Sequence, residues 1–365
     1  MADYILERNP INASFELTVR CNLRCKMCLF RHDEAENNDL KVNELSAKQW
    51  IDFARQAAEM GIGGILFTGG EPLLRDDFPE IYEGVYQHGF IISLYTNATL
   101  VTPEIMNLFR KYPPHKIGIS IYGATPETYK TVCGSSSAFQ KAIDGSRSLL
   151  TLPSVIEFRS TIIKDNLHES RAIEELVKDE FGEKYPVSLS RMVMKSVRGA
   201  CSDVESCRLS PEDNVRLMLQ KSIDTLKNKI GKNFDEKNIR IHYGINKSKT
   251  DCFSPRLKAS LLGCGGGTDS FAVTWDGKLQ ACQLLGAFQT DAVKHGLKKA
   301  WEIFPLEIKL PPFDSKCQNC SLGEICQCCF ASRYAETGSL SGCPEYACRD
   351  SEIIDSLIFK ESKTS

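Results

Sequence analysis

Short apolar runs alternate with amphipathic stretches through about the first 200 residues of the chain. Short apolar runs bounded by turn-forming residues are typical of buried strands, whereas apolar residues three or four positions apart are typical of a helix face. Ser46 stands where it can cap the first of the helices. Strands are predicted at 15–19, 65–67, 91–95, 117–122, 156–163 and 187–194, and helices at 46–60, 78–88, 103–111, 139–150 and 169–181. Six strands alternating with helices predict an α/β fold, a parallel sheet with helices outside it.

The pattern changes after about residue 200. A more polar helix is predicted at 211–230, and a lysine-rich, irregular stretch follows it to about residue 250. Two alternating apolar runs then flank Asp276-Gly277, which is a strong signal for a β-hairpin. We therefore expect a core domain at 1–200, a bridging helix and linker at 201–250, a small cysteine-rich α+β domain at 251–350, and a helix or tail at 351–365.

Composition narrows the class of protein. The 365 residues suffice for one large domain and a smaller one, and a net charge of −2 gives no reason to expect a nucleic acid or an anionic membrane as partner. We find neither a signal-peptide pattern nor an apolar run long enough to span a bilayer, so a cytoplasmic location is predicted. In that setting the sixteen cysteines favour metal or redox sites over disulfides.

Three of these cysteines, Cys21, Cys25 and Cys28, follow the first predicted strand with the spacing C-x3-C-x2-C. A closed zinc site has four protein ligands, and an electron-transfer iron–sulfur cluster is usually held by four cysteines. Three thiolates on one short loop therefore suggest a [4Fe–4S] cluster with one iron left open. The alternatives are a zinc loop completed by a distant histidine, and ordinary buried cysteines that behave as small hydrophobes.

A second motif, Gly69-Gly70-Glu71-Pro72, breaks the apolar strand that precedes it. Glycine lets the backbone approach a ligand closely, and proline fixes the exit of the turn and removes a donor. The simpler interpretation is a plain strand–turn–helix connection, which does not account for a glutamate beside two glycines.

The two motifs, in this order and at this distance, resemble those of the radical S-adenosylmethionine (SAM) superfamily. The resemblance implies a partial (β/α)6 TIM-like barrel and a cluster whose open iron chelates the amino acid end of SAM. It also implies that residues 69–72 bind the amino group of the methionine part of SAM. An electron from the cluster would split SAM into methionine and a 5′-deoxyadenosyl radical. In such barrels the chemistry lies at the carboxyl ends of the strands, where both motifs occur.

The same rule nominates further SAM contacts. Family members place polar groups near the ribose of SAM at the end of the third strand, where Thr96 and Asn97 stand, and Ser120 lies in a segment that resembles another SAM contact. Lys141 and Arg159 are candidate cations for the SAM carboxylate. The alternatives are turn formation for Thr96 and Asn97 and a solvated helix face for Lys141. Met27 departs from the family, which usually has an aromatic residue there.

The later cysteines resemble a SPASM domain, the C-terminal extension of many radical SAM enzymes that modify peptides and proteins. The family pattern is C-x9–15-G-x4-C, then C-x2-C-x5-C-x3-C, then a last cysteine. Gly277 fits the first part, but Cys329 follows Cys326 after two residues instead of three, and Cys328 competes with it. The resemblance implies two auxiliary [4Fe–4S] clusters, one held by Cys317, Cys320, Cys326 and Cys343, the other by Cys264, Cys282 and Cys329, with Cys252 as an optional fourth ligand.

A zinc-ribbon-like domain is the alternative for these cysteines. The remaining thiols are expected to be structural: Cys133, Cys201, Cys207 and Cys348. If Cys252 is not a ligand, the nearer auxiliary cluster has an open iron that can touch substrate.

The resemblance predicts an enzyme, reduced by a flavodoxin- or ferredoxin-like donor, that abstracts a hydrogen atom from substrate while auxiliary clusters accept an electron. This suits thioether or C–C cross-link formation in a ribosomally made peptide. Only twenty residues precede Cys21, so a winged-helix domain for a leader peptide is not expected, and a leader would be bound by a separate protein or by the barrel's own edge. The alternatives are a small-molecule dehydrogenase, epimerase or decarboxylase, and an anaerobic sulfatase-type maturase, for which we assign no catalytic base. A non-enzymatic iron–sulfur carrier or zinc scaffold has no use for the SAM-binding turn.

Overall fold

The computed structural model describes residues 8–33, 37–195, 202–231, 264–304, 314–323, 325–326 and 328–360. The chain divides into two compact units. The first unit comprises residues 1–208 and 260–309, and the second comprises 209–259 and 310–365. No helix of the described residues is long and apolar enough to cross a membrane.

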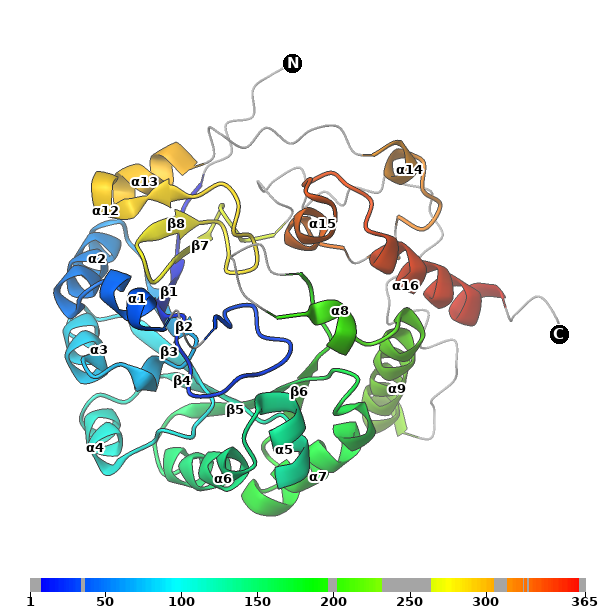
Figure 1. Cartoon of the computed structure of the whole chain (residues 1–365), viewed down its shortest axis with the longest axis horizontal. Coiled ribbons are helices and arrows are strands. Elements are labelled where there is room, and N and C mark those ends of the chain that lie inside the picture. Colours follow the sequence, from blue (N-terminus) through cyan, green and yellow to red (C-terminus); the bar gives the residue numbers. More distant parts are fainter. Residues whose placement is uncertain are drawn as a thin grey trace. The chain divides into compact units, whose positions relative to one another are not determined.

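The first unit is built on one curved, unclosed sheet of nine strands (Figure 1). The strand order is β6-β5-β4-β3-β2-β1-β7-β8-β9. The bounds are β1 Asn12–Thr18, β2 Gly64–Gly69, β3 Ile91–Thr96, β4 Lys116–Ser120, β5 Val155–Thr161, β6 Val187–Ser190, β7 Ser270–Val273, β8 Lys278–Gln280 and β9 Thr290–Asp291. Strands β1 to β6 pair in parallel, which confirms the predicted α/β fold and partial barrel.

The predicted hairpin exists as β7 and β8, and it extends the sheet of the first unit. Strand β7 pairs in parallel with the outer edge of β1, from Asn12 opposite Ser270 to Phe15 opposite Val273. Strands β8 and β9 continue the sheet in antiparallel pairs. The edge of β1 offers unpaired backbone groups, which a strand from any part of the chain can satisfy. Local patterning could not reveal this long-range pairing.

Helices cover the outer face of the sheet. The helices of the first unit are α1 Asn37–Asn43, α2 Ala47–Glu59, α3 Phe78–Tyr86, α4 Pro103–Lys111, α5 Pro126–Cys133, α6 Ser137–Leu149, α7 Ser170–Phe181, α8 Val204–Cys207, α12 Ala292–His295 and α13 Leu297–Ile303. Ser46 caps α2 in a capping box with Gln49, as its position predicted. Helix α5 was not predicted, although Thr125 as N-cap followed by Pro126 is a recognisable helix start.

The core lies between the sheet and this helical layer. Phe15 of β1 packs against Trp50 of α2 with ring centroids 5.0 Å apart. Phe67 of β2 packs on Tyr82 of α3 at 5.8 Å, and all four side chains are fully buried. Alternate residues of a strand point to opposite faces, so the neighbours of these aromatics face the inside of the barrel. That inner face is left for the polar side chains of the site.

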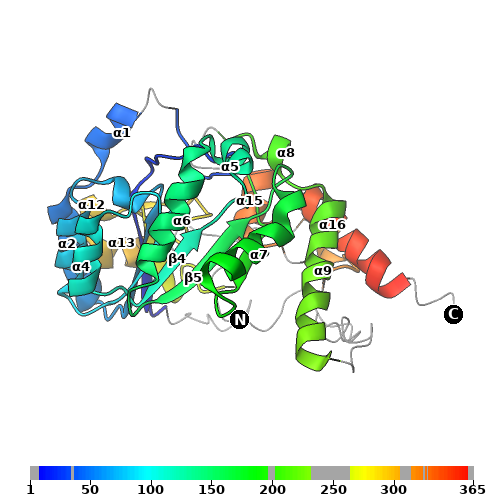
Figure 2. The same cartoon turned by 90° about the horizontal axis from the view of Figure 1, so that it is seen from below.

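The second unit has a small core of its own. It contains α9 Pro211–Ile230, α14 Ser315–Gln318, α15 Phe330–Thr337, α16 Glu345–Asp355 and a π-helical turn, Ser356–Lys360. Helices α9 and α16 lie side by side (Figure 2) and bury Val215, Met218 and Ile354 between them. Asn214 Nδ2 donates a 2.6 Å hydrogen bond to Asp350 Oδ2 across this contact.

Candidate active site

The first three cysteines lie on the loop that follows β1. Backbone hydrogen bonds tie this loop to the end of α5, from Arg24 N to Cys133 O (2.9 Å) and from Lys26 N to Val132 O (3.0 Å). Lys26 Nζ also forms an ion pair with Asp165 at 2.7 Å. The sulfur atoms are held toward a cavity of about 300 Å³ at the carboxyl ends of the strands, which we call the cysteine cavity. Cys21, Cys25 and Cys28 all line it.

Burial favours the protonated form of these thiols, although the nearby Arg31 opposes it at Cys25 and Cys28. Burial raises the pKa of Cys28 to about 12 and that of Cys21 well above its ordinary value. The pKa of Cys25 is raised first by a hydrogen bond with the buried thiol of Cys133 and then by burial. A metal centre binds thiolates, so bound iron would supply the positive charge that these sulfurs need.

Within the described part of the chain, no three His, Cys, Asp or Glu side chains are arranged to hold one metal ion. Cys21, Cys25 and Cys28 are half-buried and line a common cavity, and they are the three ligands that the sequence predicted for a four-iron cluster.

The glycines of the second motif are required by close packing against the start of the cysteine loop. A Cβ at Gly69, whose φ is +126°, would lie 2.1 Å from Thr18 O, and one at Gly70 would lie 2.2 Å from Arg20 O. The close approach allows Gly70 N to bond Thr18 O (2.7 Å) and Glu71 N to bond Arg20 O (2.9 Å). The two sequence motifs are therefore joined directly through their backbones.

Glu71 is buried behind the cavity. Its carboxylate accepts hydrogen bonds from Leu73 N (3.1 Å), Thr96 Oγ1 (2.8 Å) and Asn97 N (2.7 Å). Burial is the largest influence on this group and raises its pKa to about 7. Glu71 thus fixes the end of β3 to the turn, while Pro72 starts the short 3-10 turn η2, Pro72–Leu74.

Asn97 connects this network to the thiols. Its Nδ2 lies 3.0 Å from Asn22 Oδ1 and 3.7 Å from Cys21 Sγ. Gly69, Gly70, Thr96 and Asn97 line the cysteine cavity, whereas Glu71 and Pro72 stand behind it.

Ser120 and Arg159 face the same cavity from neighbouring strands. They are register partners on β4 and β5. The Arg159 guanidinium lies over the ring of Tyr95 at 4.2 Å, a cation–π contact that holds it in the cavity. Lys141 is exposed on α6 and is not brought into the cavity. Met27 is buried and lines the cavity.

Several cavity residues were missed by the sequence predictions. Tyr95, Tyr122, Thr161, Met192 and Gln283 line the cysteine cavity as well. The first four lie in or just after a predicted strand, so the strand-end rule was sufficient to find them. Gln283 comes from the loop after β8, and only the pairing of β7 with β1 brings it here.

The later cysteines fall into two groups. Cys264 and Cys282 belong to the first unit and flank Gly266, whose hypothetical Cβ would lie 3.5 Å from Cys264 Sγ and 3.6 Å from the Cβ of Cys282. Cys329 belongs to the second unit, where its sulfur accepts from Ser332 N at the start of α15. Cys252 and Cys201 lie outside the described residues.

The second unit gathers more thiols than the sequence predicted. Cys343 Sγ and Cys348 Sγ are 3.2 Å apart, and Arg333 Nη1 donates to Cys317 Sγ at 3.4 Å. Burial raises the pKa of Cys348 with further contributions from Cys317, Cys320 and Cys326. Cys348, which was expected to be a structural thiol, therefore lies close to the cysteines that were predicted as ligands. Cys348 lies in the first turn of α16, and Cys343 immediately precedes the N-cap of this helix, Pro344, which explains the proximity.

The other thiols differ among themselves. Cys328 is surrounded by Cys326, Cys329 and Arg333, and burial raises its pKa to about 12. Cys207 is buried at the end of α8, and its backbone carbonyl accepts from Lys164 N. Cys133 touches Cys25, as described above.

Comparison with known proteins agrees with this geometry. Residues 15–169 match the Radical SAM superfamily. The AdoMet-dependent heme synthase of Methanosarcina barkeri (strain Fusaro / DSM 804) is 29% identical over 341 residues, covering 90% of this chain and 93% of that protein.

Two solved structures share the fold. Streptococcus suis SuiB bound to the precursor peptide SuiA has a TM-score of 0.68 at 18% identity, covering 93% of this chain and 76% of that chain. Native anSMEcpe with bound AdoMet has a TM-score of 0.61 at 16% identity, covering 96% of this chain and 98% of that chain. Residues 15–169 include the whole cysteine loop and the Gly-Gly-Glu-Pro turn, so both motifs lie in the part of the chain that matches the Radical SAM superfamily.

Proposed function

We propose that this enzyme splits SAM at a [4Fe–4S] cluster held by Cys21, Cys25 and Cys28 and oxidatively modifies a ribosomally made peptide. One observation carries the first part of the proposal. Three half-buried thiols and the Gly69–Gly70 backbone line a single cavity, and backbone hydrogen bonds join the two motifs. When bound, the cluster would supply the electron that converts SAM into methionine and a 5′-deoxyadenosyl radical.

The remaining residues of the cavity would bind and orient SAM. Arg159, held over Tyr95, offers a cation to the SAM carboxylate, and Ser120 offers a hydroxyl on the adjacent strand. Asn97 is fixed by Glu71 and presents its amide beside Cys21. The apolar wall of Leu23, Met27 and Leu29 would exclude water from the reacting atoms.

The later thiols would hold auxiliary clusters. In the second unit the candidates are Cys317, Cys320 and Cys326 together with Cys343 or Cys348. Cys264 and Cys282 of the first unit would contribute thiolates to the other cluster. Such clusters would accept the electron left on the substrate, which makes the net reaction an oxidation.

A tetrapyrrole is a second candidate substrate. It is favoured by the heme synthase that is similar to this chain over nearly the full length of both proteins. The two candidates differ in charge and size, since a porphyrin is wide, rigid and carries carboxylates.

The test is an anaerobic assay of the reconstituted, dithionite-reduced enzyme with SAM. Formation of 5′-deoxyadenosine with an iron content of about twelve per chain would support the radical enzyme with three clusters. Precursor peptides encoded beside this chain and an iron porphyrin bearing carboxylate side chains would then be supplied in parallel. A mass loss of two hydrogens from a peptide supports the first candidate, and loss of carbon dioxide from the porphyrin supports the second. An enzyme that binds zinc, or forms no 5′-deoxyadenosine, would contradict the proposal.

A further inference from the structure

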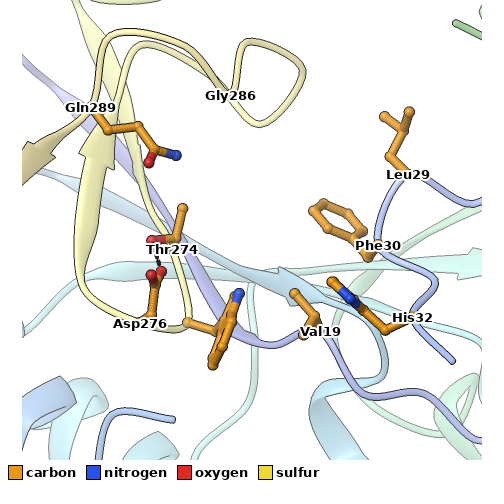
Figure 3. Close-up of a pocket in the computed structure, with 9 residues that line it drawn as sticks. Val19, Leu29, Phe30, His32, Thr274, Asp276, Gly286 and Gln289 are labelled. Atoms are coloured by element: carbon orange, nitrogen blue, oxygen red, sulfur yellow. Dashed lines mark hydrogen bonds between the residues drawn. The ribbon is translucent and has the colours of Figure 1, made fainter. Parts of the chain in front are cut away.

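A second cavity of about 190 Å³ opens beside the cysteine cavity (Figure 3). Its apolar wall consists of Val19 at the end of β1, Leu29 and Phe30 of the cysteine loop, and Trp275 in the β7–β8 turn. Asp276 and Gln289 supply polar groups on the opposite side, and Figure 3 shows the Gln289 side chain pointing into the space. We call this the adjoining cavity.

The two cavities share walls. Leu29 and Phe30 line both of them. The loop after β8 also serves both, since Gln283 and Leu284 line the cysteine cavity while Gly286 and Gln289 line the adjoining one. A molecule that reacts in the cysteine cavity can therefore extend along this loop into the adjoining cavity.

Gln283 stands where such a molecule would pass. Its Nε2 atom is buried, and no acceptor among the described residues lies within hydrogen-bond distance. A buried donor without a partner is costly and is rare in folded proteins, so a bound ligand is the expected source of an acceptor. A glutamine amide carries both a donor and an acceptor, which suits pairing with a peptide group.

The charged residues that line the adjoining cavity disfavour the binding of a negatively charged ligand. Among the described residues, its lining includes no lysine or arginine, and His32 is its one residue that can become a cation. It also includes the carboxylate of Asp276, which accepts a hydrogen bond from Thr274 Oγ1 at 2.5 Å. Arg159, the one arginine that the described residues bring to the cysteine cavity, is already assigned to the carboxylate of SAM. A ligand rich in carboxylates would find repulsion here without a permanent cation to compensate it.

Size restricts the occupant further. Sites for whole small molecules usually measure about 300–1,000 Å³, so a cavity of about 190 Å³ accommodates only part of a substrate. Aromatic rings such as Phe30 and Trp275 favour another ring or an aliphatic side chain as the part that enters.

We propose that the adjoining cavity is a subsite for an aromatic or large apolar side chain of a peptide substrate, and that Gln283 Nε2 donates a hydrogen bond to a backbone carbonyl of that substrate. The proposal rests on the peptide substrate of the proposed function and adds a sequence preference to it. The substrate residue that reacts would be a neighbour of the residue bound in the subsite.

The test is equilibrium dialysis of the SAM-loaded holoenzyme with two probes, N-acetyl-L-phenylalanine amide and toluene. Toluene has the ring but no acceptor. Gln289→Trp fills the adjoining cavity with an indole ring and is expected to lower the affinity for both probes at least about tenfold. Gln140→Trp is the matched control, because Gln140 is an exposed glutamine on α6 with one side-chain hydrogen bond, and it should change neither affinity.

Gln283→Leu is expected to lower the affinity for the amide probe about tenfold, which is the effect of losing one hydrogen bond, and to leave the affinity for toluene unchanged. A merely structural effect of the substitution would weaken both probes, which would overturn the role of Gln283. Gln283→Asn, which keeps a donor, should restore part of the lost affinity.

Three results would overturn the subsite itself. The amide probe would fail to bind the wild-type enzyme, it would bind equally well to Gln289→Trp, or N-acetyl-L-phenylalanine with its free carboxylate would bind more tightly than the amide. The last result would favour an anionic substrate. Failure of the proposed function is seen separately, as an absence of 5′-deoxyadenosine or as reaction of the porphyrin in place of any peptide.

Discussion

The cysteines of the two units differ in what determines their positions. In the first unit three thiols lie on one loop between a strand of the sheet and the end of α5, and backbone hydrogen bonds hold it on both sides. In the second unit the thiols come from separate segments, and the regular structure among the described ones is short, such as the four residues of α14. The cysteines that bind a cluster can be predicted where the backbone fixes their positions. They cannot be predicted where more cysteines lie close together than one cluster needs.

The surplus is visible in the second unit. Cys317, Cys320, Cys326, Cys343 and Cys348 lie near one another, although one four-iron cluster needs four ligands. The described residues of the first unit show no such redundancy at the cysteine loop. The neighbour of Cys25 is Cys133, which is buried in α5 and hydrogen-bonds to Cys25 instead of lining the cavity.

The largest expected effect is that of Cys28→Ala. The described residues bring three thiols to the cysteine cavity, so the variant should lose about four of about twelve irons and form no 5′-deoxyadenosine. Cys326→Ala removes a thiol from the second unit and should lower 5′-deoxyadenosine formation far less, by under about tenfold. Iron content and 5′-deoxyadenosine are measured on the anaerobically reduced proteins. An equally complete loss in Cys326→Ala would show that the two groups of thiols are not independent.

Gly70→Ala tests whether the backbone determines the first site. The new Cβ would lie 2.2 Å from Arg20 O and 2.7 Å from Val19 O, and neither carbonyl can move without the cysteine loop. We expect the free energy of unfolding to fall by about 4 kcal/mol or more, with loss of SAM binding. Gly63→Ala is the control, since Gly63, like Gly70, has no positive φ and its added Cβ would lie 3.8 Å from the nearest described atom, Ile11 O. A similar loss of stability in both variants would show that the loss of a glycine as such, and not the close contact with the cysteine loop, causes the effect.

Glu71 makes the stability of the first unit dependent on pH. Its pKa is raised from 4.5 to about 7 by burial, so between these values the folded protein keeps a proton that the unfolded chain has lost. The contribution is fully present below pH 4.5 and is lost as pH rises through 7, by roughly 3 kcal/mol. Denaturant unfolding of the SAM-free protein and of Glu71→Gln should show this slope in the wild type only. An equal slope in both proteins would place the titration elsewhere.

Much of the first unit followed from local pattern. The six parallel strands, the capped helix after Ser46 and both motifs were predictable because each depends on residues close together in sequence. Arg159 was predicted as a cation near SAM, and it does line the cavity because its strand pairs in register with Ser120. Lys141 was predicted on the same grounds, but its helix face turns to solvent.

What could not be predicted depends on contacts between distant segments. Gln283 reaches the cavity only because β7 pairs with β1, a strand from the opposite end of the first unit's sequence. Cys348 joins its group through the turn that precedes α16, and its spacing departs from the pattern used to choose Cys343. Local spacing carries no information on either event.

The smallest expected effect is that of replacing Cys343 or Cys348 alone. It tests whether the second unit has more cysteines than its cluster needs. Because their sulfur atoms are 3.2 Å apart, either one can take the place of the other beside Cys317. Each single alanine variant should therefore lose less than about one iron, whereas the double variant should lose about four. Cys207→Ala, a buried thiol at the end of α8, controls for the loss of a sulfur as such. A loss of about four irons in Cys343→Ala alone would contradict this expectation. The second unit would then have one defined set of four ligands, as the first site has three. The two units would differ only in how easily their ligands can be predicted from the sequence.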